Sequence, residues 1–262
     1  MLKPAFTLEK IWDFSSRTVI VTGGARGIGA AICRLLAHLG ARISFTYFSA
    51  TDEAERLKNE LESQTQIFVQ KLDVRDPKSV EAYVQRVHQQ FGPIHGLVNN
   101  ASHASAKGWN QPFTAIDPDA VRQTLETDIM GSWTMTRAVV PFMPDGEAAI
   151  VNLASAAAWI GDAETAMYSP AKMGIVGFTR SLARLLAPGI RVNAVAPGSV
   201  QTHWLETWHL SRSDIEHLKD SVLLKRLVAP EEIAWAVAFL LSKAARSVTG
   251  QTWVIDAGMT FH

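Results

Sequence analysis

The sequence has little cysteine, no long apolar run and no excess of charge of either sign. Cys33 is the only cysteine among the 262 residues, which excludes an internal disulfide, and its apolar surroundings favour a packed thiol. No window approaches the ~18 consecutive apolar residues of a membrane-spanning helix, and residues 1–16 lack the long apolar segment of a secretory signal. We therefore expect a cytoplasmic protein with no membrane partner.

The balance of charge bears on the class of partner. Lys and Arg together number 25, as do Asp and Glu, so the formal net charge is zero. Nucleic acids and anionic membranes bind surfaces with excess positive charge, and the sequence contains no run of Lys or Arg. His, Cys and Asp residues do not have the spacing of metal ligands either. We expect a small-molecule substrate, with no nucleic-acid partner and no bound metal.

Short segments rich in Val and Ile alternate with longer segments of helical periodicity. The predicted strands are 17–22, 42–47, 66–73, 95–99, 148–154, 190–196 and 251–256. The predicted helices are 26–39, 51–63, 77–90, 118–141, 163–186 and 230–243. Apolar strands that alternate with helices are typical of a doubly wound parallel sheet. We predict an α/β fold with one Rossmann-type domain over residues 17–262, helices on both faces of the sheet, and an N-terminal extension over residues 1–16.

A glycine-rich loop, residues 22–29, follows the first predicted strand and precedes a helix. Gly23 permits a tight turn, Gly27 lets the backbone approach a pyrophosphate, and Gly29 lets the helix pack closely against the strand. The helix N-terminus directs free N–H groups and a positive dipole end towards phosphates. The spacing is G-x-x-x-G-x-G, not the commoner G-x-G-x-x-G. Its place between strand and helix predicts a dinucleotide-binding loop.

The end of the second predicted strand bears on which dinucleotide binds. NAD-selective sites usually place an Asp or Glu there to bind the ribose 2′-hydroxyl. This sequence reads Tyr47-Phe48-Ser49 instead, with no acid before Asp52. Arg26 in the glycine-rich loop can bind a 2′-phosphate through charge-assisted hydrogen bonds, although a solvated loop cation is the alternative. We predict that NADP(H) is the preferred cofactor and keep NAD(H) as the alternative.

Polar residues also follow the third, fourth and sixth predicted strands. Asp73 can accept a hydrogen bond from an adenine amino group, or cap the turn that follows it, and Asn100 can tie loop backbone together beside the cofactor. The segment from Pro197 to Thr202 can hold a nicotinamide carboxamide. The residues expected to bind the cofactor are Gly23, Arg26, Gly27, Ile28, Gly29, Tyr47, Ser49, Asp73, Val74, Asn100, Ala101, Tyr168, Lys172, Pro197, Gly198, Val200 and Thr202.

Tyr168 and Lys172 are four residues apart in a predicted helix, so their side chains share one face. An unperturbed tyrosine, with a pKa of ~10, is a poor acid–base catalyst near neutrality. A neighbouring lysine cation favours the phenolate and lowers that pKa. Ser155 lies just beyond the fifth predicted strand, where its hydroxyl can bind the substrate oxygen and stabilise developing charge. These three residues predict proton transfer at a carbonyl or alcohol.

With these motifs the chain resembles the short-chain dehydrogenase/reductase family over essentially everything after residue 16, and within it the 3-oxoacyl-ACP-reductase-like branch. The resemblance implies NADPH-dependent reduction of a carbonyl group and a homo-oligomer, either a tetramer or a dimer. The matching segments are 22–29, Asp73, 99–101, Ser155, Tyr168, Lys172, 197–202, Arg226, 230–234, 250–251 and 256–259.

Two positions depart from the family pattern. Ser102 replaces the glycine of Asn-Asn-Ala-Gly, and Asp128 stands where the family has a fourth catalytic residue, an asparagine that holds a water linking the lysine to solvent. Asp128 can accept from such a water or from Lys172 directly, and a buried carboxylate there favours charged lysine and weakens its effect on Tyr168. Three outcomes stay open: a working relay with shifted pH dependence, a different reaction, or an inactive protein.

Two stretches rich in aromatic residues, 102–115 after the fourth predicted strand and 202–222 after the sixth, are expected to line the substrate pocket, which favours an apolar or cyclic substrate. The alternative is that these tryptophans pack the loops onto the domain or fill a subunit interface. The segment around Asp145 and Glu147 is acidic, which disfavours docking of an acidic carrier protein, so a free substrate and a carrier-bound one both stay open. The predicted substrate residues are His103, Trp109, Trp204 and Trp208.

Three functions compete on these residues. The leading prediction is an NADPH-dependent reductase in which Tyr168 donates the proton and Ser155 binds the substrate oxygen. The reverse reaction, NAD-dependent alcohol oxidation, uses the same groups. A non-catalytic dinucleotide-binding sensor or scaffold that lost the relay through Asp128 is the third, although such a protein has no need for Ser155, Tyr168 and Lys172 together.

Overall fold

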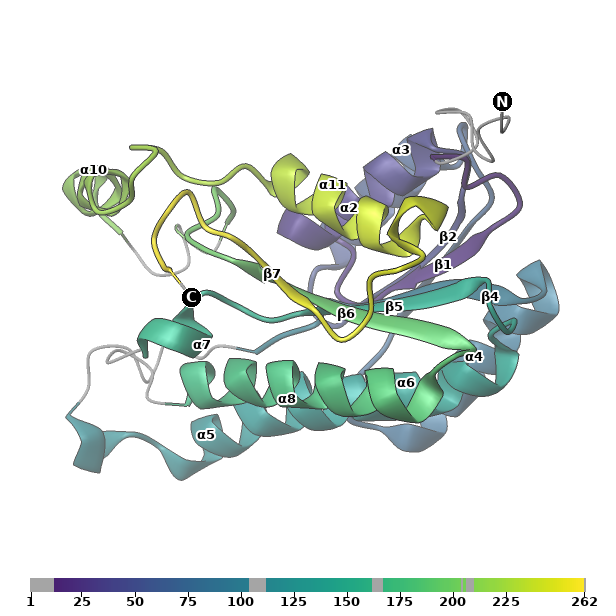
Figure 1. The fold of residues 1–262 in the computed structure, drawn as a ribbon, viewed down its shortest axis with the longest axis horizontal. Coiled ribbons are helices and arrows are strands. Elements are labelled where there is room, and N and C mark those ends of the chain that lie inside the picture. The colour runs from purple at the N-terminus through teal and green to yellow at the C-terminus, as the bar shows by residue number, and fades with distance from the viewer. Residues whose placement is uncertain (1–11, 104–111, 162–166, 204, 206–209, 262) are drawn as a thin grey trace.

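The fold is taken from a computed structural model that describes residues 12–103, 112–161, 167–203, 205 and 210–261. One parallel sheet of seven strands forms its centre, in the order β3-β2-β1-β4-β5-β6-β7 (Figure 1). The strands are β1 (Thr18–Val21), β2 (Arg42–Tyr47), β3 (Ile67–Lys71), β4 (Ile94–Asn99), β5 (Ala148–Leu153), β6 (Ile190–Pro197) and β7 (Thr252–Ile255). The predicted α/β fold is confirmed.

Helices cover both faces of the sheet. The α-helices are α2 (Gly27–His38), α3 (Thr51–Leu61), α4 (Pro77–Phe91), α5 (Pro118–Leu125), α6 (Gly131–Val139), α7 (Ala157–Ile160), α8 (Tyr168–Leu186), α10 (Arg212–Asp220) and α11 (Pro230–Leu241). Figure 1 shows α2, α3 and α11 over one face and α4, α6 and α8 over the other. Two buried apolar clusters, one on each side, hold these layers to the strands.

The strand order places two loops side by side at the middle of the sheet. From β1 the chain builds β2 and β3 on one side, and then crosses to β4 on the other side of β1. The loops after β1 and β4 therefore meet at the carboxyl ends of their strands, where the backbone N–H of Asn100 donates to the hydroxyl of Thr22 at 2.9 Å. Open α/β sheets bind ligands at such a reversal of strand order.

The predicted helix over 118–141 is interrupted, and this expectation of one continuous helix is corrected. The chain forms α5, then a π-helical segment over Glu126–Met130, then α6. A π-helical turn inserts one extra residue into the hydrogen-bond ladder and rotates the side chains that follow. Asp128 lies in this segment and is buried.

The core has the composition that a doubly wound sheet requires. Most residues of β1, β2, β4, β5 and β6 are buried, as parallel strands covered on both faces must be.

Cys33 on α2 is fully buried and packs in one of the apolar clusters, which confirms the packed thiol, and burial raises its pKa. Phe14, from the predicted extension, is buried in the same cluster, and Trp12 packs against Trp235 of α11 with ring centroids 5.8 Å apart.

Among the residues that the structure describes, two α-helices lie outside the predicted set. The short helix α7 follows β5, and α10 precedes α11. The sequence signal for α10 is its capping box, in which the Ser211 hydroxyl accepts from the Asp214 backbone and the Asp214 carboxylate accepts from Ser211.

Two further findings concern the described residues alone. None of their helices is long and apolar enough to cross a membrane. Within the same ranges, no group of three or more His, Cys, Asp or Glu side chains is arranged to hold a metal ion.

Candidate active site

A cavity of about 1090 Å³ runs along the carboxyl ends of the strands. It collects loops that are far apart in the sequence, as expected for parallel strands that end at one edge. The predicted residues that line it are Gly23, Arg26, Gly27, Ile28, Gly29, Tyr47, Ser49, Asp73, Val74, Asn100, Ala101, His103, Ser155, Tyr168, Lys172, Pro197, Gly198, Val200 and Thr202. The predicted Trp109, Trp204 and Trp208 lie outside the described residues.

The glycine-rich loop is held against the loop after β4. The side-chain amide of Asn100 donates to the carbonyl oxygens of Thr22 at 2.9 Å and Gly23 at 3.0 Å. Gly27 has a φ of +54°, and a Cβ atom added to Gly29 would lie 2.3 Å from the Gly23 carbonyl oxygen. The loop therefore requires glycine at these positions, and Asn100 fixes its path.

The N-terminus of α2 opens onto the same part of the cavity. Its first turn contains no acidic residue, and the N-cap Arg26 makes no side-chain capping bond. The backbone N–H groups of a first helical turn have no partners within the helix, so they and the dipole favour an anion here. The geometry fits a phosphate-bearing ligand.

The outer end of the cavity carries a cation that the sequence analysis did not identify. The Arg75 guanidinium binds both carboxylate oxygens of Asp73, with Nη2 2.6 Å from Oδ2, and lies 5.8 Å from the ring centroid of Phe48. The hydrogen bonds from Arg75 hold the pKa of Asp73 below its ordinary value. Residues 47–50, which continue from β2, add no acid to the cavity lining. No sequence pattern marks Arg75, because its role comes from folding back onto Asp73.

Lys172 lines the cavity and is almost fully buried. Its Nζ donates to the Leu153 carbonyl oxygen at 3.1 Å and lies 3.0 Å from Oδ2 of Asp128. Burial by itself lowers the pKa of Lys172. The negative charge of Asp128, and the Tyr168 phenol, outweigh that effect and raise the pKa above its ordinary value. Lys172 is therefore an ammonium ion at neutral pH.

Tyr168 and Ser155 lie on the wall of the same cavity. Tyr168 begins α8, one turn before Lys172, whose Nζ is 5.4 Å from the centroid of the tyrosine ring. Ser155 follows β5, and its hydroxyl oxygen accepts from the Ala157 backbone N–H at 3.2 Å. A phenol beside a cation and a second hydroxyl on one wall can bind an oxygen atom and exchange a proton with it.

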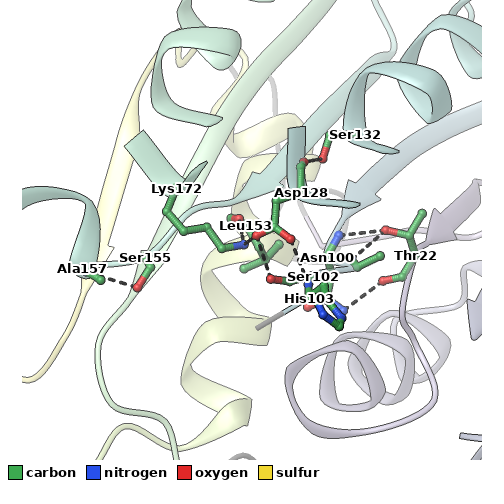
Figure 2. Close-up of polar contacts among 11 residues, drawn as sticks. Thr22, Asn100, Ser102, His103, Asp128, Ser132, Leu153, Ser155, Ala157 and Lys172 are labelled. Atoms are coloured by element: carbon green, nitrogen blue, oxygen red, sulfur yellow. Dashed lines mark hydrogen bonds and ion pairs between the residues drawn. The ribbon is translucent and has the colours of Figure 1, made fainter. Parts of the chain in front are cut away.

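Asp128 contacts Lys172 directly, and it also contacts the other departure from the family pattern (Figure 2). The Ser102 hydroxyl donates to Oδ2 of Asp128 at 2.8 Å, and the His103 backbone N–H donates to Oδ1 at 2.9 Å. Asp128 does not itself line the cavity but lies beneath Lys172. The contact with Ser102 joins residues 26 apart in the sequence, and no local spacing indicates it.

The cavity contains further lining residues, most of them within the predicted pocket stretch 202–222. They come from the loop after β6, from α10 and the residues before it, and from the C-terminal segment: His203, Leu205, Leu210, Asp214, His217, Leu218 and Met259. Helix α10 therefore contributes to the wall of the cavity. The stretch 202–222 that contains α10 was predicted to line the pocket, but its helix was not predicted.

Comparisons with known proteins place the whole chain in one family. A family model described as enoyl-(acyl carrier protein) reductase matches residues 23–260. The cis-4-hydroxycyclohexanecarboxylate dehydrogenase of Sinomonas cyclohexanicum is 37% identical over 251 residues, which cover 94% of this chain and 98% of that protein. The 3-oxoacyl-[acyl-carrier-protein] reductase of Escherichia coli (strain K12) is 33% identical over 251 residues, again covering 94% and 98%.

Solved structures agree in fold along nearly the full length. A short-chain dehydrogenase/reductase from Brucella melitensis has a TM-score of 0.89 at 31% identity, and the match covers 95% of this chain and 99% of that chain. A blue fluorescent protein from a metagenomic library, solved in complex with NADPH, has a TM-score of 0.86 at 33% identity, with coverages of 95% and 100%.

The packing of the glycine-rich loop predicts the effect of a single methyl group. Gly29→Ala places its Cβ against the Gly23 carbonyl, so the loop must move, and we expect the free energy of unfolding in urea to fall by about 1–3 kcal/mol. Gly177→Ala is the matched control, because a Cβ there, on the exposed face of α8, meets nothing within 4 Å. We expect the control to raise stability by up to about 1 kcal/mol. Equal effects of the two variants would contradict the close packing at Gly29.

Proposed function

The chain belongs to the short-chain dehydrogenase/reductase family of NAD(P)-dependent oxidoreductases, and from this premise we propose that it reduces a carbonyl group to an alcohol with NADPH. Tyr168 is the proton donor in this proposal, and the substrate is a small apolar or cyclic molecule. One observation supports this function above the others: Ser155, Tyr168 and Lys172 line the same cavity as the glycine-rich loop and the N-terminus of α2.

In this proposal, different residues of the cavity bind different parts of the cofactor. The glycine-rich loop and the N-terminus of α2 fit the pyrophosphate. Lys172 fits the nicotinamide ribose, and the segment from Pro197 to Thr202 fits the carboxamide. NADPH, when bound, supplies the hydride.

The reacting groups act on the substrate oxygen. The Ser155 hydroxyl donates a hydrogen bond to that oxygen and orients it. As negative charge develops, the Tyr168 phenol transfers its proton to the same oxygen, so that the alcohol leaves neutral. The Lys172 ammonium, whose Nζ is 5.4 Å from the tyrosine ring centroid, stabilises the phenolate that this transfer produces.

The cofactor preference is proposed from charge. Asp52 and Glu53, the nearest acids after β2, do not line the cavity, and Arg26 and Arg75 do. A 2′-phosphate carries negative charge that these guanidinium groups can bind in a bidentate manner. The complex of the metagenomic relative with NADPH agrees with this choice, and NAD(H) stays the alternative cofactor.

The substrate class is proposed from the apolar part of the lining and from one relative. Leu205, Leu210 and Leu218 contribute to the cavity beside His103, and a pocket of this kind favours an apolar body with few polar anchors. The Sinomonas relative is named for a substituted cyclohexane. A six-membered cyclic ketone is therefore the first substrate to test, and a 3-oxoacyl thioester, after the Escherichia coli relative, is the second.

We also propose that the protein forms a homo-oligomer, a tetramer or a dimer. Met130, Trp133 and Met173 are large apolar side chains exposed at 51%, 42% and 40% on the π-helical segment, α6 and α8. Exposed apolar side chains on adjoining helices are typical of a subunit interface.

Removal of the Tyr168 hydroxyl separates binding from turnover. We expect Tyr168→Phe to lower kcat for ketone reduction by roughly 10² to 10⁴-fold, the usual contribution of a positioned acid, and to leave the Kd for NADPH unchanged. Tyr83→Phe is the control, since its hydroxyl is buried against Ser44 outside the cavity lining; it should lose stability but keep turnover. NADPH oxidation on a ketone panel is the measurement. Full activity of Tyr168→Phe would rule out Tyr168 as the proton donor.

Removal of the Arg26 guanidinium tests the cofactor preference. We expect Arg26→Ala to raise the Kd for NADPH about tenfold, the loss of a hydrogen bond to a charged group, and to leave the Kd for NADH unchanged. Arg34→Ala is the control, because Arg34 pairs with Glu60 on the surface and does not line the cavity. Titration of tryptophan fluorescence gives both constants. If Arg26→Ala weakened both cofactors equally, the 2′-phosphate assignment would be wrong.

A further inference from the structure

The Asp128 carboxylate lies at the centre of a buried polar cluster. Neither the fold nor the proposed reaction requires a carboxylate at this position. Its side chain is 0% exposed. Oδ2 accepts from the Ser102 hydroxyl at 2.8 Å and lies 3.0 Å from Lys172 Nζ, while Oδ1 accepts from the His103 backbone N–H at 2.9 Å. A buried carboxylate needs several donors to remain ionised, and this one has three.

The pattern of donors is specific for a carboxylate. The His103 N–H and the Lys172 ammonium can only donate, and they approach different oxygens of Asp128. An amide at position 128 has one acceptor end and one donor end. In either orientation of this amide, its NH₂ group would face the His103 N–H or the Lys172 ammonium, and that donor would then have no acceptor at position 128. The site is therefore matched to aspartate and does not accommodate the family's asparagine equally well.

The hydrogen bond from the Ser102 hydroxyl links the loop after β4 to this carboxylate. Asp128 comes from the π-helical segment, Lys172 from α8, and Ser102 from the loop that follows β4, as Figure 2 shows for their side chains. A glycine at position 102, as in the family pattern, has no hydroxyl to donate. The two departures from that pattern are thus in direct contact. The Ser102 hydroxyl supplies a hydrogen-bond donor, and the Asp128 carboxylate supplies its acceptor.

The charges around the pair define its electrostatic effect. Of the elements packed against it, α8 contributes Tyr168, the loop after β4 contributes the His103 side chain, and the π-helical segment contributes Glu126. The charged side chains of α5 and α6 are exposed: Asp119, Arg122 and Arg137. Of these groups, the Lys172 cation, 5.4 Å from the Tyr168 ring centroid, and the Asp128 anion paired with it are the buried charges, and their effects on the phenol oppose each other.

Building on the proposed function, we propose that Ser102 and Asp128 act as one unit that fixes the Lys172 ammonium and partly cancels its field at Tyr168. Ser102 is then a positioning residue that acts through Asp128. The consequence is that the Tyr168 phenol keeps its proton to a higher pH than it would beside an unpaired lysine. Reduction needs the protonated phenol, so the pair extends the pH range over which reduction is fast.

The direct test is the alkaline limb of kcat/KM for NADPH-dependent ketone reduction in a set of variants. Asp128→Asn should move that limb to lower pH by about one unit, the size of effect expected for loss of one nearby charge, because the Leu153 carbonyl and the amide oxygen still hold Lys172 as a cation. Ser102→Ala should move it in the same direction by less, because the carboxylate is no longer held against Lys172. The double variant should match Asp128→Asn alone, because Ser102 acts only through the carboxylate.

Ser132→Ala is the matched control for these variants. The Ser132 hydroxyl donates to the backbone carbonyl of Asp128 at 2.6 Å and does not touch its carboxylate. It should leave the alkaline limb unchanged. If Asp128→Asn does not fold, the comparison of Ser102→Ala with Ser132→Ala still decides, because only the first should move the limb. An unmoved limb in Ser102→Ala, or equal shifts in both serine variants, would overturn the proposal.

A second readout does not depend on turnover. In urea unfolding, Ser102→Ala should lower the midpoint in the wild-type background and have a clearly smaller effect in the Asp128→Asn background. Equal effects in the two backgrounds would refute the pairing. The unfolding data can show that Ser102 and Asp128 interact even if the wild-type protein reduces no ketone. In that case the Ser102–Asp128 pairing is supported and the proposed reductase function is refuted, so the two failures are distinguishable.

Discussion

The buried ammonium of Lys172 is the constraint on which the rest of this site depends. A cation that is 4% exposed at its side chain is stabilised by a partner of opposite charge and by further hydrogen bonds. Asp128 and the Leu153 carbonyl supply both, at 3.0 and 3.1 Å. The position of one cation therefore fixes the end of β5, the start of α8 and the π-helical segment relative to one another.

The same constraint links the reacting groups to the phosphate-binding end of the cavity. The loop after β4 contacts the glycine-rich loop through Asn100 and contacts Asp128 through Ser102 and His103. Four consecutive residues thus connect the two ends of the cavity. In the proposed reaction, such a short, hydrogen-bonded connection would hold the hydride donor and the proton donor in one geometry, which is the main requirement for a reaction that moves both.

The parts of this architecture that follow from local patterns were predictable from the sequence, and those that follow from folding were not. The strands and the glycine-rich loop are marked by apolar runs and by glycine, and Tyr168 and Lys172 by helical spacing. The π-helical segment at Asp128 was missed because its extra residue leaves the apolar pattern almost unchanged. Ser102 on Asp128 is a contact between a loop and the π-helical segment, 26 residues apart, that no local spacing encodes. Arg75 pairs with Asp73, only two residues before it, through the turn that follows β3. The only sequence signal for helix α10 is its capping box. The tryptophans of the same stretch predict a pocket lining and do not indicate a helix.

The protonation state of Lys172 tests the central claim most directly. NMR of ¹³Cε-labelled lysine, with the Lys172 resonance assigned from its loss in Lys172→Arg, reports the charge of this one group as pH is raised. The ion pair with Asp128 predicts that Lys172 stays charged at neutral pH, with a pKa above the ordinary value for lysine. A Lys172 resonance that titrates near neutral pH would mean that burial outweighs the carboxylate, and it would contradict the account.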